Sequence, residues 1–520
     1  MNEASTKRRP RGGRAARMAA RAELSAQKPV VPGMTGGRYR PLSDSAIQRI
    51  HTSALDILES VGFADPLPSC VELVTAAGGR LNDAGRLCFP RSLVEDVLAK
   101  ACRRFTLHGL DPERSLDIGD DRVHFGTAGA AVEILDLETR EFRPTTLLDL
   151  YDTTRLIDTL DNVHLALRTL ICRDMEEPQD LDINTAYALL AGTTKPFGQG
   201  FALPESVPRI ATMFDMALGG EGKFRQQPFF LAANCFVVPP LRFAEDNCLC
   251  LEAQVRAGMP VILISAGQAG ATAPAALAGA VVQAVAECLA GLVYVNLIAP
   301  GHPVLFGTWP FISDLRTGAM CGGSGEQAVL MAACTQMGLF YDLPSSIGAG
   351  MTDSKIPDAQ SGFEKGYTTA LAAQAGANMI NESAGMHASL LGVSLESLVI
   401  DNEMLGNVLR TVRGVEVTDE TLSVDTIGEV AAGPSHYLGH PQTLGLMEKD
   451  YVYPELSDRS TPDQWREAGA TDIVARAREK VRRVLAEHYP GHLDGETDSR
   501  IRDAFDICLD PGDMKPGGRW

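Results

Sequence analysis

Short apolar runs alternate with helix-patterned stretches from residue 162 onward, and this rhythm limits the possible folds more than any other feature of the sequence. Several runs are apolar almost throughout, which is typical of parallel strands that are covered on both faces. Eight such runs, most of them followed by a helical stretch, predict an α/β fold of the (β/α)8 TIM-barrel type. The runs read VHLALRTLI, KPFGQGFAL, FFLAANCFVV, PVILISAG, HPVLFGTW, PSSIGAG, NMINESAG and SLVIDN.

A doubly wound open sheet is the alternative fold that fits the same alternation. Such a sheet commonly carries a G-x-G-x-x-G turn after its first strand. No such turn follows the first apolar run of this chain, so the barrel is the favoured prediction.

The sequence on either side of the barrel pattern predicts additional regions. Residues 41–143 combine helical spacing with short alternating stretches, and they predict an accessory N-terminal α+β region. Residues 144–417 hold the predicted barrel. Residues 418–520 include the charged amphipathic stretch DIVARAREKVRRVLAEH and predict a C-terminal helical extension.

Residues 1–40 are rich in Arg, Ala and Gly, and they predict a flexible basic tail. The tail contains RRPRGGR, but no apolar core follows it, as an export signal would require. We therefore expect a cytoplasmic protein. The tail has no assigned role, although its charge would suit an acidic neighbour or nucleic acid.

Composition excludes several classes of partner. The 520-residue chain carries a net charge of −19, which argues against nucleic acid or an anionic membrane as a partner of the protein body. The most apolar stretch, residues 275–298, is interrupted by Gln283, Glu287 and Asn296 and predicts a buried helix. Eleven cysteines without a C-x-x-C pair indicate free, mostly buried thiols in a reducing compartment.

The segment GAGMTDSKIPDAQSGFEKGY is an unusually polar junction between a predicted strand and a predicted helix. Pro357 and Asp358 suit the start and the cap of that helix, so part of the polarity is ordinary capping. Capping does not account for Asp353 and Lys355. These two residues are therefore candidates for a role in the barrel mouth.

Functional residues of such a barrel lie where its strands end and in the loops that follow. The residues at these positions are rich in aromatic rings and acids, a combination that suits a methylated ammonium group. Ordinary structural roles are the alternative: aromatic rings close a core, loop acids are solvated, and a lone histidine is hydrogen-bonded within the protein. The candidates are Arg173, Phe236, Trp309, Phe311, Asp353, Lys355, Glu382, His387 and Asp401.

Other chemistries lack their motifs. The chain has no G-x-S-x-G elbow, P-loop or H-E-x-x-H pattern. The stretch GGSGEQ resembles a phosphate-binding turn, but Glu326 in the first helical turn favours a simple tight turn. No His, Cys and Asp cluster has metal-ligand spacing, so we expect no metal site.

The sequence resembles the trimethylamine:corrinoid methyltransferase family, including its branch without pyrrolysine, to which glycine betaine methyltransferases belong. The resemblance runs through nearly the whole chain. It rests on RRPRGGRAARMAAR, LSDSAIQRIHTSALDILESVGF, RFTLHGLDPERSLDIG, FGTAGAAVEILD, GAGMTDSKIPDAQSGFEKGY and HPQTLGLMEKDYVYPELSDRSTPDQW. It implies a (β/α)8 barrel that moves a methyl group from a methylated amine to the cobalt of a separate corrinoid protein.

The resemblance also bears on the substrate. The chain contains only the standard residues, so no position corresponds to the pyrrolysine of the founding branch. A quaternary ammonium already carries its positive charge and leaves as a neutral amine, whereas trimethylamine first needs activation. The resemblance and this chemistry together favour glycine betaine or a similar betaine, bound by a site that positions the substrate rather than activating it.

We expect Asp353, Lys355 and Glu382 to act in catalysis. A donor for the substrate carboxylate is sought among His387, Lys355 and Arg173, in that order. The predicted cage for the ammonium group consists of Phe236, Trp309 and Phe311, with Glu382 or Asp401 offsetting its charge.

The corrinoid is expected on a partner protein that enters at an open barrel mouth, and the chain is expected to form a homo-oligomer. Two alternatives stay open. The first is the same reaction on trimethylamine or another methylated amine. The second is a non-catalytic cytoplasmic protein that binds quaternary amines.

Overall fold

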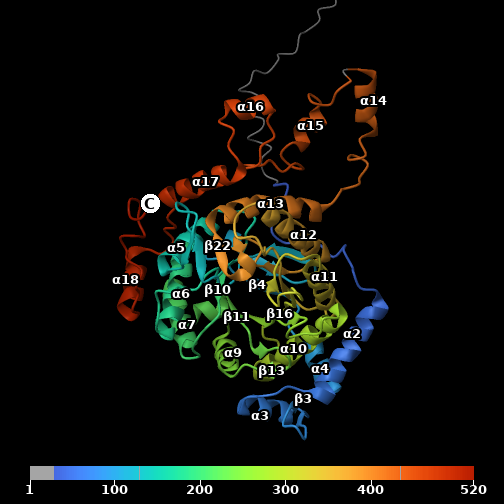
Figure 1. The fold of residues 1–520 in the computed structure, drawn as a ribbon, viewed down its shortest axis with the longest axis vertical. Helices are drawn as coiled ribbons and strands as arrows, with labels where there is room; N and C mark the ends of the chain where they lie inside the picture. Colours follow the sequence, from blue (N-terminus) through green and yellow to red (C-terminus); the bar gives the residue numbers. More distant parts are fainter. Residues whose placement is uncertain (1–27, 128, 434) are drawn as a thin grey trace, which may run out of the picture.

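The computed structural model describes residues 28–127, 129–433 and 435–520. The basic segment predicted as a flexible tail lies mostly outside these residues. A closed barrel of eight parallel strands forms the body of the protein, which confirms the predicted (β/α)8 fold (Figure 1). In barrel order the strands are β6 (Arg122–Phe125), β9 (Ala166–Leu167), β10 (Phe197–Gln199), β11 (Phe230–Asn234), β14 (Val261–Ser265), β16 (Val304–Thr308), β19 (Ser345–Gly348) and β20 (Met379–Asn381).

Parallel pairing of β20 with β6, together with a parallel bridge between Gly126 and Leu165, closes the barrel. Each strand leads to one helix of the outer ring, and the barrel therefore keeps the alternation that the sequence shows. The helices are α5 (Leu147–Asp158), α6 (Pro178–Gly192), α7 (Ser206–Ala217), α9 (Glu245–Ala257), α10 (Leu277–Ile298), α11 (Gly325–Phe340), α12 (Ala359–Ala375) and α13 (Leu395–Arg413).

Seven of the eight predicted strands are confirmed, and the prediction of a strand at SLVIDN is wrong. This run lies in α13, where Ser394 caps the helix by accepting a hydrogen bond from the Ser397 backbone N–H. A short apolar run fits a strand and a buried helix equally well, so periodicity alone could not separate them. The missing strand is β6, RVHF, which lies within residues 41–143, the segment assigned to the accessory region.

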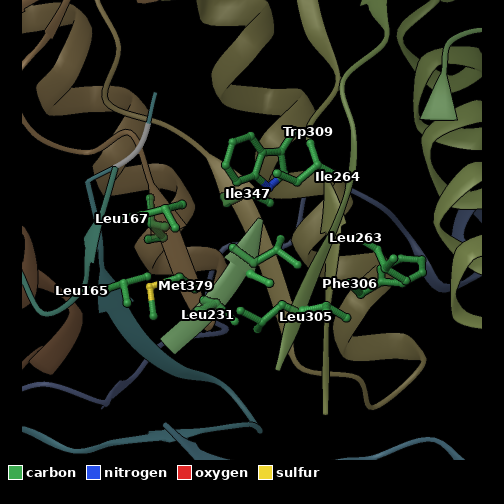
Figure 2. Close-up of a cluster of buried hydrophobic side chains, with 14 of the residues drawn as sticks. Leu165, Leu167, Leu231, Leu263, Ile264, Leu305, Phe306, Trp309, Ile347 and Met379 are labelled. Carbon is green, nitrogen blue, oxygen red and sulfur yellow. The ribbon is translucent and has the colours of Figure 1, made fainter. Parts of the chain in front are cut away.

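The barrel core is built from aliphatic side chains of neighbouring strands, several of which are drawn in Figure 2. Trp309 lies beside Ile264 and Ile347 in this view, where β16 ends. Leu263 faces the opposite way, because its side chain contacts Gly291 of α10.

Additional strands occupy the two ends of the barrel. The hairpin of β4 (Phe105–Leu107) and β5 (Leu116–Ile118) covers the end where the strands begin, since His108 N–H donates to the Pro228 carbonyl just before β11 (2.9 Å). Two small sheets frame the opposite end, which is the mouth. One consists of β21 (Met386–His387), β22 (Gly392–Ser394), β7 (Glu133–Leu135) and β8 (Phe142–Pro144), and the other of β15 (Gln268–Ala269), β17 (Phe311–Ser313) and β18 (Met320–Cys321).

The flanking regions pack on the outside of the helical ring. The N-terminal helices α2 (Asp44–Asp56), α3 (Pro68–Ala76) and α4 (Arg91–Lys100) contact α10. Near the C-terminus, α17 (Ile473–Glu487) lies on α13 and α5, and α18 (Gly495–Ala504) lies on α7. The short helices α14 (Val424–Ala432), α15 (Pro441–Leu446) and α16 (Pro462–Glu467) stand out from the barrel (Figure 1).

The remaining short elements are β1 (Met34–Thr35), which pairs antiparallel with β6, the hairpins β2 (Arg80–Leu81)/β3 (Leu87–Cys88) and β12 (Val237–Val238)/β13 (Arg242–Phe243), α8 (Lys223–Gln226), η1 (Ile57–Val61), η2 (Pro112–Arg114) and η3 (Ala388–Leu390). Among the described residues, α10 is the one helix long and apolar enough to span a membrane. Its most apolar window is 83% buried within the protein, as in the core helix of a globular fold.

Candidate active site

Glu382 is the most distinctive residue of the barrel mouth. It follows β20 directly. Its backbone φ is 62°, a value that residues other than glycine rarely adopt. The side chain is 3% exposed, and its Oε2 has no hydrogen-bond partner among the described residues. Burial raises the pKa of this carboxyl to about 8. A strained and buried acid without a hydrogen-bond partner, placed at a strand end, is typical of active-site residues that contact a ligand.

Trp309 and Glu382 converge on Gly348, the last residue of β19. A methyl group placed on Gly348 would lie 2.9 Å from Glu382 Oε2 and 3.2 Å from Cε3 of the Trp309 indole. Any larger residue at this position would therefore press on both groups. The glycine keeps the carboxylate and the aromatic ring close together without an intervening side chain.

Ser346 holds the neighbouring groups in place. Its Oγ accepts hydrogen bonds from the indole Nε1 of Trp309 (3.2 Å) and from Asn381 Nδ2 (2.9 Å). Asn381 Oδ1 is buried without a hydrogen-bond partner in the described chain. The mouth thus contains a further polar atom that a ligand or water could satisfy.

Arg168 and Cys235 belong to the same mouth, following β9 and β11. The Cys235 side chain is accessible, yet burial raises the pKa of its thiol to about 11, with the Glu382 carboxylate raising it and the Arg168 guanidinium lowering it. Cys235 is therefore accessible at the mouth and close enough to both charged groups to be affected by them. Arg168 Nε is buried and has no partner in the described residues, so a cationic donor and an anionic acceptor both act on the space around Cys235.

Asp353 and Lys355 do not form a pair of free reactive groups. The Asp353 carboxylate accepts hydrogen bonds from Gly322 N–H (2.7 Å), the Cys321 thiol (2.9 Å) and the Ser389 hydroxyl. Lys355 is exposed, and its ammonium donates to the backbone carbonyl of Asp353 (2.7 Å). The polar groups of the segment after β19 are therefore used in hydrogen bonds that join three loops at the rim of the mouth.

His387 is a structural histidine, so its prediction as the first-choice carboxylate donor is corrected. Its Nε2 lies 2.6 Å from Ser397 Oγ, and its Nδ1 lies 3.2 Å from the Ser354 carbonyl. Burial, and then the nearby Lys365 ammonium, hold the pKa of the ring well below its usual value. A neutral ring with both nitrogens engaged by the protein has no free donor for a substrate.

Three other candidates do not meet at Gly348 with Glu382 and Trp309. Phe236 is fully buried, and its ring packs against Gly291 of α10. A methyl group on that glycine would lie 2.6 Å from the ring. Phe236 therefore faces the helix layer and cannot belong to the predicted cage. Arg173 is exposed, and its backbone N–H donates to the Thr145 carbonyl. Phe311 lies in β17 at the rim of the mouth and is buried.

Asp401 lies in α13 rather than at a strand end. It is buried against Lys365, whose Nζ is 2.7 Å away, and it accepts a hydrogen bond from Gly385 N–H (2.8 Å). The protein itself therefore neutralises this acid. Its hydrogen bond nevertheless fixes the loop that carries Glu382, three residues earlier in the chain.

The structure thus brings together Trp309 and Glu382 from the predicted set, and it adds Arg168, Cys235, Ser346 and Gly348. The predicted first strand ran past Arg168, so this residue was counted within the strand. A charged residue interrupting an apolar run was the one signal that could have marked the strand end. The roles of Ser346 and Gly348 leave no comparable trace in the sequence.

Comparison with known proteins places the chain in a family. The family model described as trimethylamine methyltransferase (MTTB) matches residues 10–506. A protein named trimethylamine methyltransferase MttB from Desulfitobacterium hafniense (strain DSM 10664 / DCB-2) is 32% identical, with 88% of this chain and 92% of the relative covered. A protein named glycine betaine methyltransferase from D. hafniense (strain Y51) is 31% identical, with coverage of 89% and 96%.

A trimethylamine methyltransferase MttB from Methanosarcina thermophila is 29% identical, with coverage of 89% and 96%. Among solved structures, the Methanosarcina barkeri monomethylamine methyltransferase (MtmB) is similar at a TM-score of 0.46 and 12% identity, covering 90% of this chain and 98% of its own. The family match spans nearly the entire sequence. The chain is a methyltransferase that belongs to the trimethylamine methyltransferase (MTTB) family.

Proposed function

We propose that the protein transfers a methyl group from a betaine, such as glycine betaine, to the Co(I) of a corrinoid carried by a separate protein. The main support for this proposal is that the Glu382 carboxylate, whose Oε2 has no hydrogen-bond partner in the described residues, and the Trp309 ring both lie next to Gly348. The ring quadrupole and the carboxylate attract a methylated ammonium, which has no N–H to donate. The relative named glycine betaine methyltransferase supports the same substrate class.

Arg168 supports a substrate with a carboxylate. Its guanidinium and the Glu382 carboxylate both act on Cys235, so the mouth offers a cationic group and an anionic group to the two ends of a zwitterion. A guanidinium binds a carboxylate with two parallel hydrogen bonds. We therefore replace His387, Lys355 and Arg173 with Arg168 as the donor for the substrate carboxylate.

The chain would act mainly by positioning. A Co(I) corrinoid supplies the nucleophile that accepts the methyl group, and a quaternary nitrogen leaves as a neutral amine. Trp309 and Glu382 would hold the ammonium, while Arg168 fixes the direction of the molecule, so that one methyl group faces the open mouth. No proton needs to reach the leaving nitrogen, so the elevated pKa of Glu382 is compatible with a binding role.

The rim of the mouth suits a docking corrinoid protein. Large apolar side chains are exposed at this end of the barrel, on loops at Leu315 (70%), Ile356 (42%) and Leu391 (60%) and in the second turn of α12 at Phe363 (59%). Exposed apolar groups around a polar cavity are typical of a partner interface. The eleven free cysteines agree with a reducing cytoplasm as the site of the reaction.

The test is a methyl-transfer assay with purified protein, reduced corrinoid protein or free cob(I)alamin, and a panel of methylated amines. We expect methylcobalamin from glycine betaine, and a fall in kcat/KM of about tenfold or more for Arg168→Met. The same variant should affect choline, a quaternary amine without a carboxylate, by about twofold at most.

Turnover of trimethylamine alone would contradict the substrate assignment. Calorimetric binding of betaine with no methylcobalamin from any amine would instead indicate a binding protein and would overturn the proposed reaction.

A further inference from the structure

A projecting arm, residues 415–470, lies between α13 and α17 and carries α14, α15 and α16. Figure 1 shows it standing out from the barrel. It has almost no core, since Val430 is the one buried residue of α14, and α15 and α16 bury none. Helices this short are not stable without packing, so the arm needs a surface to cover it.

The arm exposes apolar side chains at an unusual density. Of the 22 large hydrophobic residues exposed in the described chain, 11 lie in the arm. They are Val415, Val417, Leu422, Val424, Ile427, Tyr437, Leu438, Leu444, Tyr451, Tyr453 and Trp465. Patches of this kind mark interaction sites.

The arm is also strongly acidic. Residues 415–470 contain 11 aspartates and glutamates but only three lysines and arginines. Nine of the acids are exposed. A covering partner should therefore be basic and carry small apolar groups that fit between the exposed side chains.

The N-terminal segment of the same chain reaches the body beside the root of this arm. Arg413 binds the Pro29 carbonyl (3.3 Å), the Lys449 carbonyl (2.8 Å) and the Asp450 carboxylate (2.8 Å) with its guanidinium. One arginine therefore joins the beginning of the described chain to the arm.

Lys28 lies at the edge of a groove at the same root. Its ammonium pairs with Asp161 (3.1 Å), which lines a cavity of about 280 Å³ between α13 and the arm. Asn402 and Glu403 of α13 line one side of this cavity, and Tyr453 and Glu455 of the arm line the other.

We propose that the arm is the docking surface for the chain's own N-terminal segment, residues 1–27. This segment has seven lysines and arginines against two glutamates, and RAARMAARAEL alternates arginine with alanine, methionine and leucine. The acidic, apolar surface of the arm complements that pattern. Tyrosine rings on the arm offer further contacts to guanidinium groups.

Geometry favours this occupant over others. An extended chain covers roughly 3.3 Å per residue, so 27 residues reach up to about 90 Å. A covalently attached segment meets its site at an effective concentration in the millimolar range, about as high as linkers allow. The arm leaves the body at the C-terminal end of α13, on the side where the barrel strands begin. A corrinoid protein at the mouth would approach the opposite end.

Hydrogen–deuterium exchange of the full chain tests the proposal against a variant lacking residues 2–27. Without the segment, amides of residues 415–470 should exchange about tenfold faster, while barrel strands such as β14 keep their rates. A variant with Lys7, Arg8, Arg9, Arg11, Arg14, Arg17 and Arg21 changed to glutamine should behave like the truncation. The matched control with Glu3→Gln and Glu23→Gln should retain the protection. Unchanged exchange in the arm after truncation overturns the proposal.

Zero-length cross-linking decides which chain supplies the segment. In an equal mixture of ¹⁵N-labelled and unlabelled protein, Lys7 should couple to carboxylates of the arm within chains of the same label. Mixed-label products, or arm protection that rises with protein concentration, would assign the surface to a second copy and overturn docking within the chain.

Discussion

Two buried carboxylates, one in the barrel mouth and one in the helix layer behind it, differ in their hydrogen-bond partners. Asp401 lies between α12 and α13 and meets the Lys365 ammonium at 2.7 Å and the Gly385 N–H at 2.8 Å. Glu382 leaves its Oε2 without a partner in the described residues. Burial raises the pKa of both carboxyl groups. Burial and an elevated pKa are therefore common to both acids, and the missing partner is what makes Glu382 the candidate site residue.

The largest effect should come from breaking the satisfied pair. Lys365→Met leaves Asp401 buried and uncompensated, and it should lower the free energy of unfolding by about 3–5 kcal/mol. Urea unfolding followed by circular dichroism measures the loss. The double variant Lys365→Met/Asp401→Leu should regain most of it. A loss below about 1 kcal/mol in the single variant would mean that the pair is no more than a surface ion pair in strength.

Glu382→Gln should affect activity and leave the fold intact. Losing the carboxylate beside the ammonium should reduce kcat/KM by about 10²-fold, because a preorganised charge is removed from the substrate site. The urea midpoint should stay the same or rise, since a buried acid is replaced by a neutral amide. Glu326→Gln, an exposed acid in the first turn of α11, is the control and should remain within about twofold. Equal losses in both variants would contradict a specific role for Glu382.

The pH dependence of betaine binding tests the role of Glu382. Burial raises the pKa of Glu382 to about 8, so its carboxyl is largely neutral at pH 7 when no cation is bound. A bound ammonium requires the carboxylate, and betaine affinity should therefore rise by up to about tenfold per pH unit below that pKa and level off above it. Isothermal titration calorimetry across this range measures the rise. Glu382→Gln should bind weakly with a flat profile, and a flat profile in the unmodified protein would refute the assignment.

The same shift makes a prediction about stability. The folded state keeps a proton on Glu382 that the unfolded chain releases above its ordinary pKa of about 4.3. The contribution to stability is therefore present below that value and is lost as pH rises through about 8. The stability of Glu382→Gln relative to the unmodified protein should accordingly improve as pH rises across this window.

Lys355→Ala should have the smallest effect. The lysine is exposed and donates only to the carbonyl of Asp353, so its removal should change kcat/KM by about twofold at most. Methyl-transfer rates with glycine betaine check this expectation. A loss approaching that of Glu382→Gln would return Lys355 to the catalytic group.

Sequence periodicity predicted seven barrel strands correctly because each combines an apolar run with a following helix. It failed at SLVIDN and at RVHF for different reasons. SLVIDN is too short for periodicity to separate a strand from a helix turn. RVHF was assigned to the alternating stretches of the accessory region, and only its pairing partner shows that it belongs to the barrel. RVHF becomes a barrel strand because β20 accepts it as a parallel partner.

Strand-end placement also put Trp309 and Glu382 among the candidates, since a barrel directs these positions into its mouth. It could not rank Glu382 above Asp401 or His387. Their difference lies in partners from distant segments: Lys365 for Asp401, and Ser354 and Ser397 for His387.

The sequence by itself determined the barrel, most of its strands and the family, because these follow from local apolar patterning and motif content. The tertiary structure decided which polar groups are consumed inside the protein and which remain free. Hydrogen bonds and ion pairs join residues that are far apart in the chain, and the free energy of burying a charge depends on whether such a partner is present. For this reason the opening of the site at Gly348, between Glu382 and Trp309, emerged only from the folded chain.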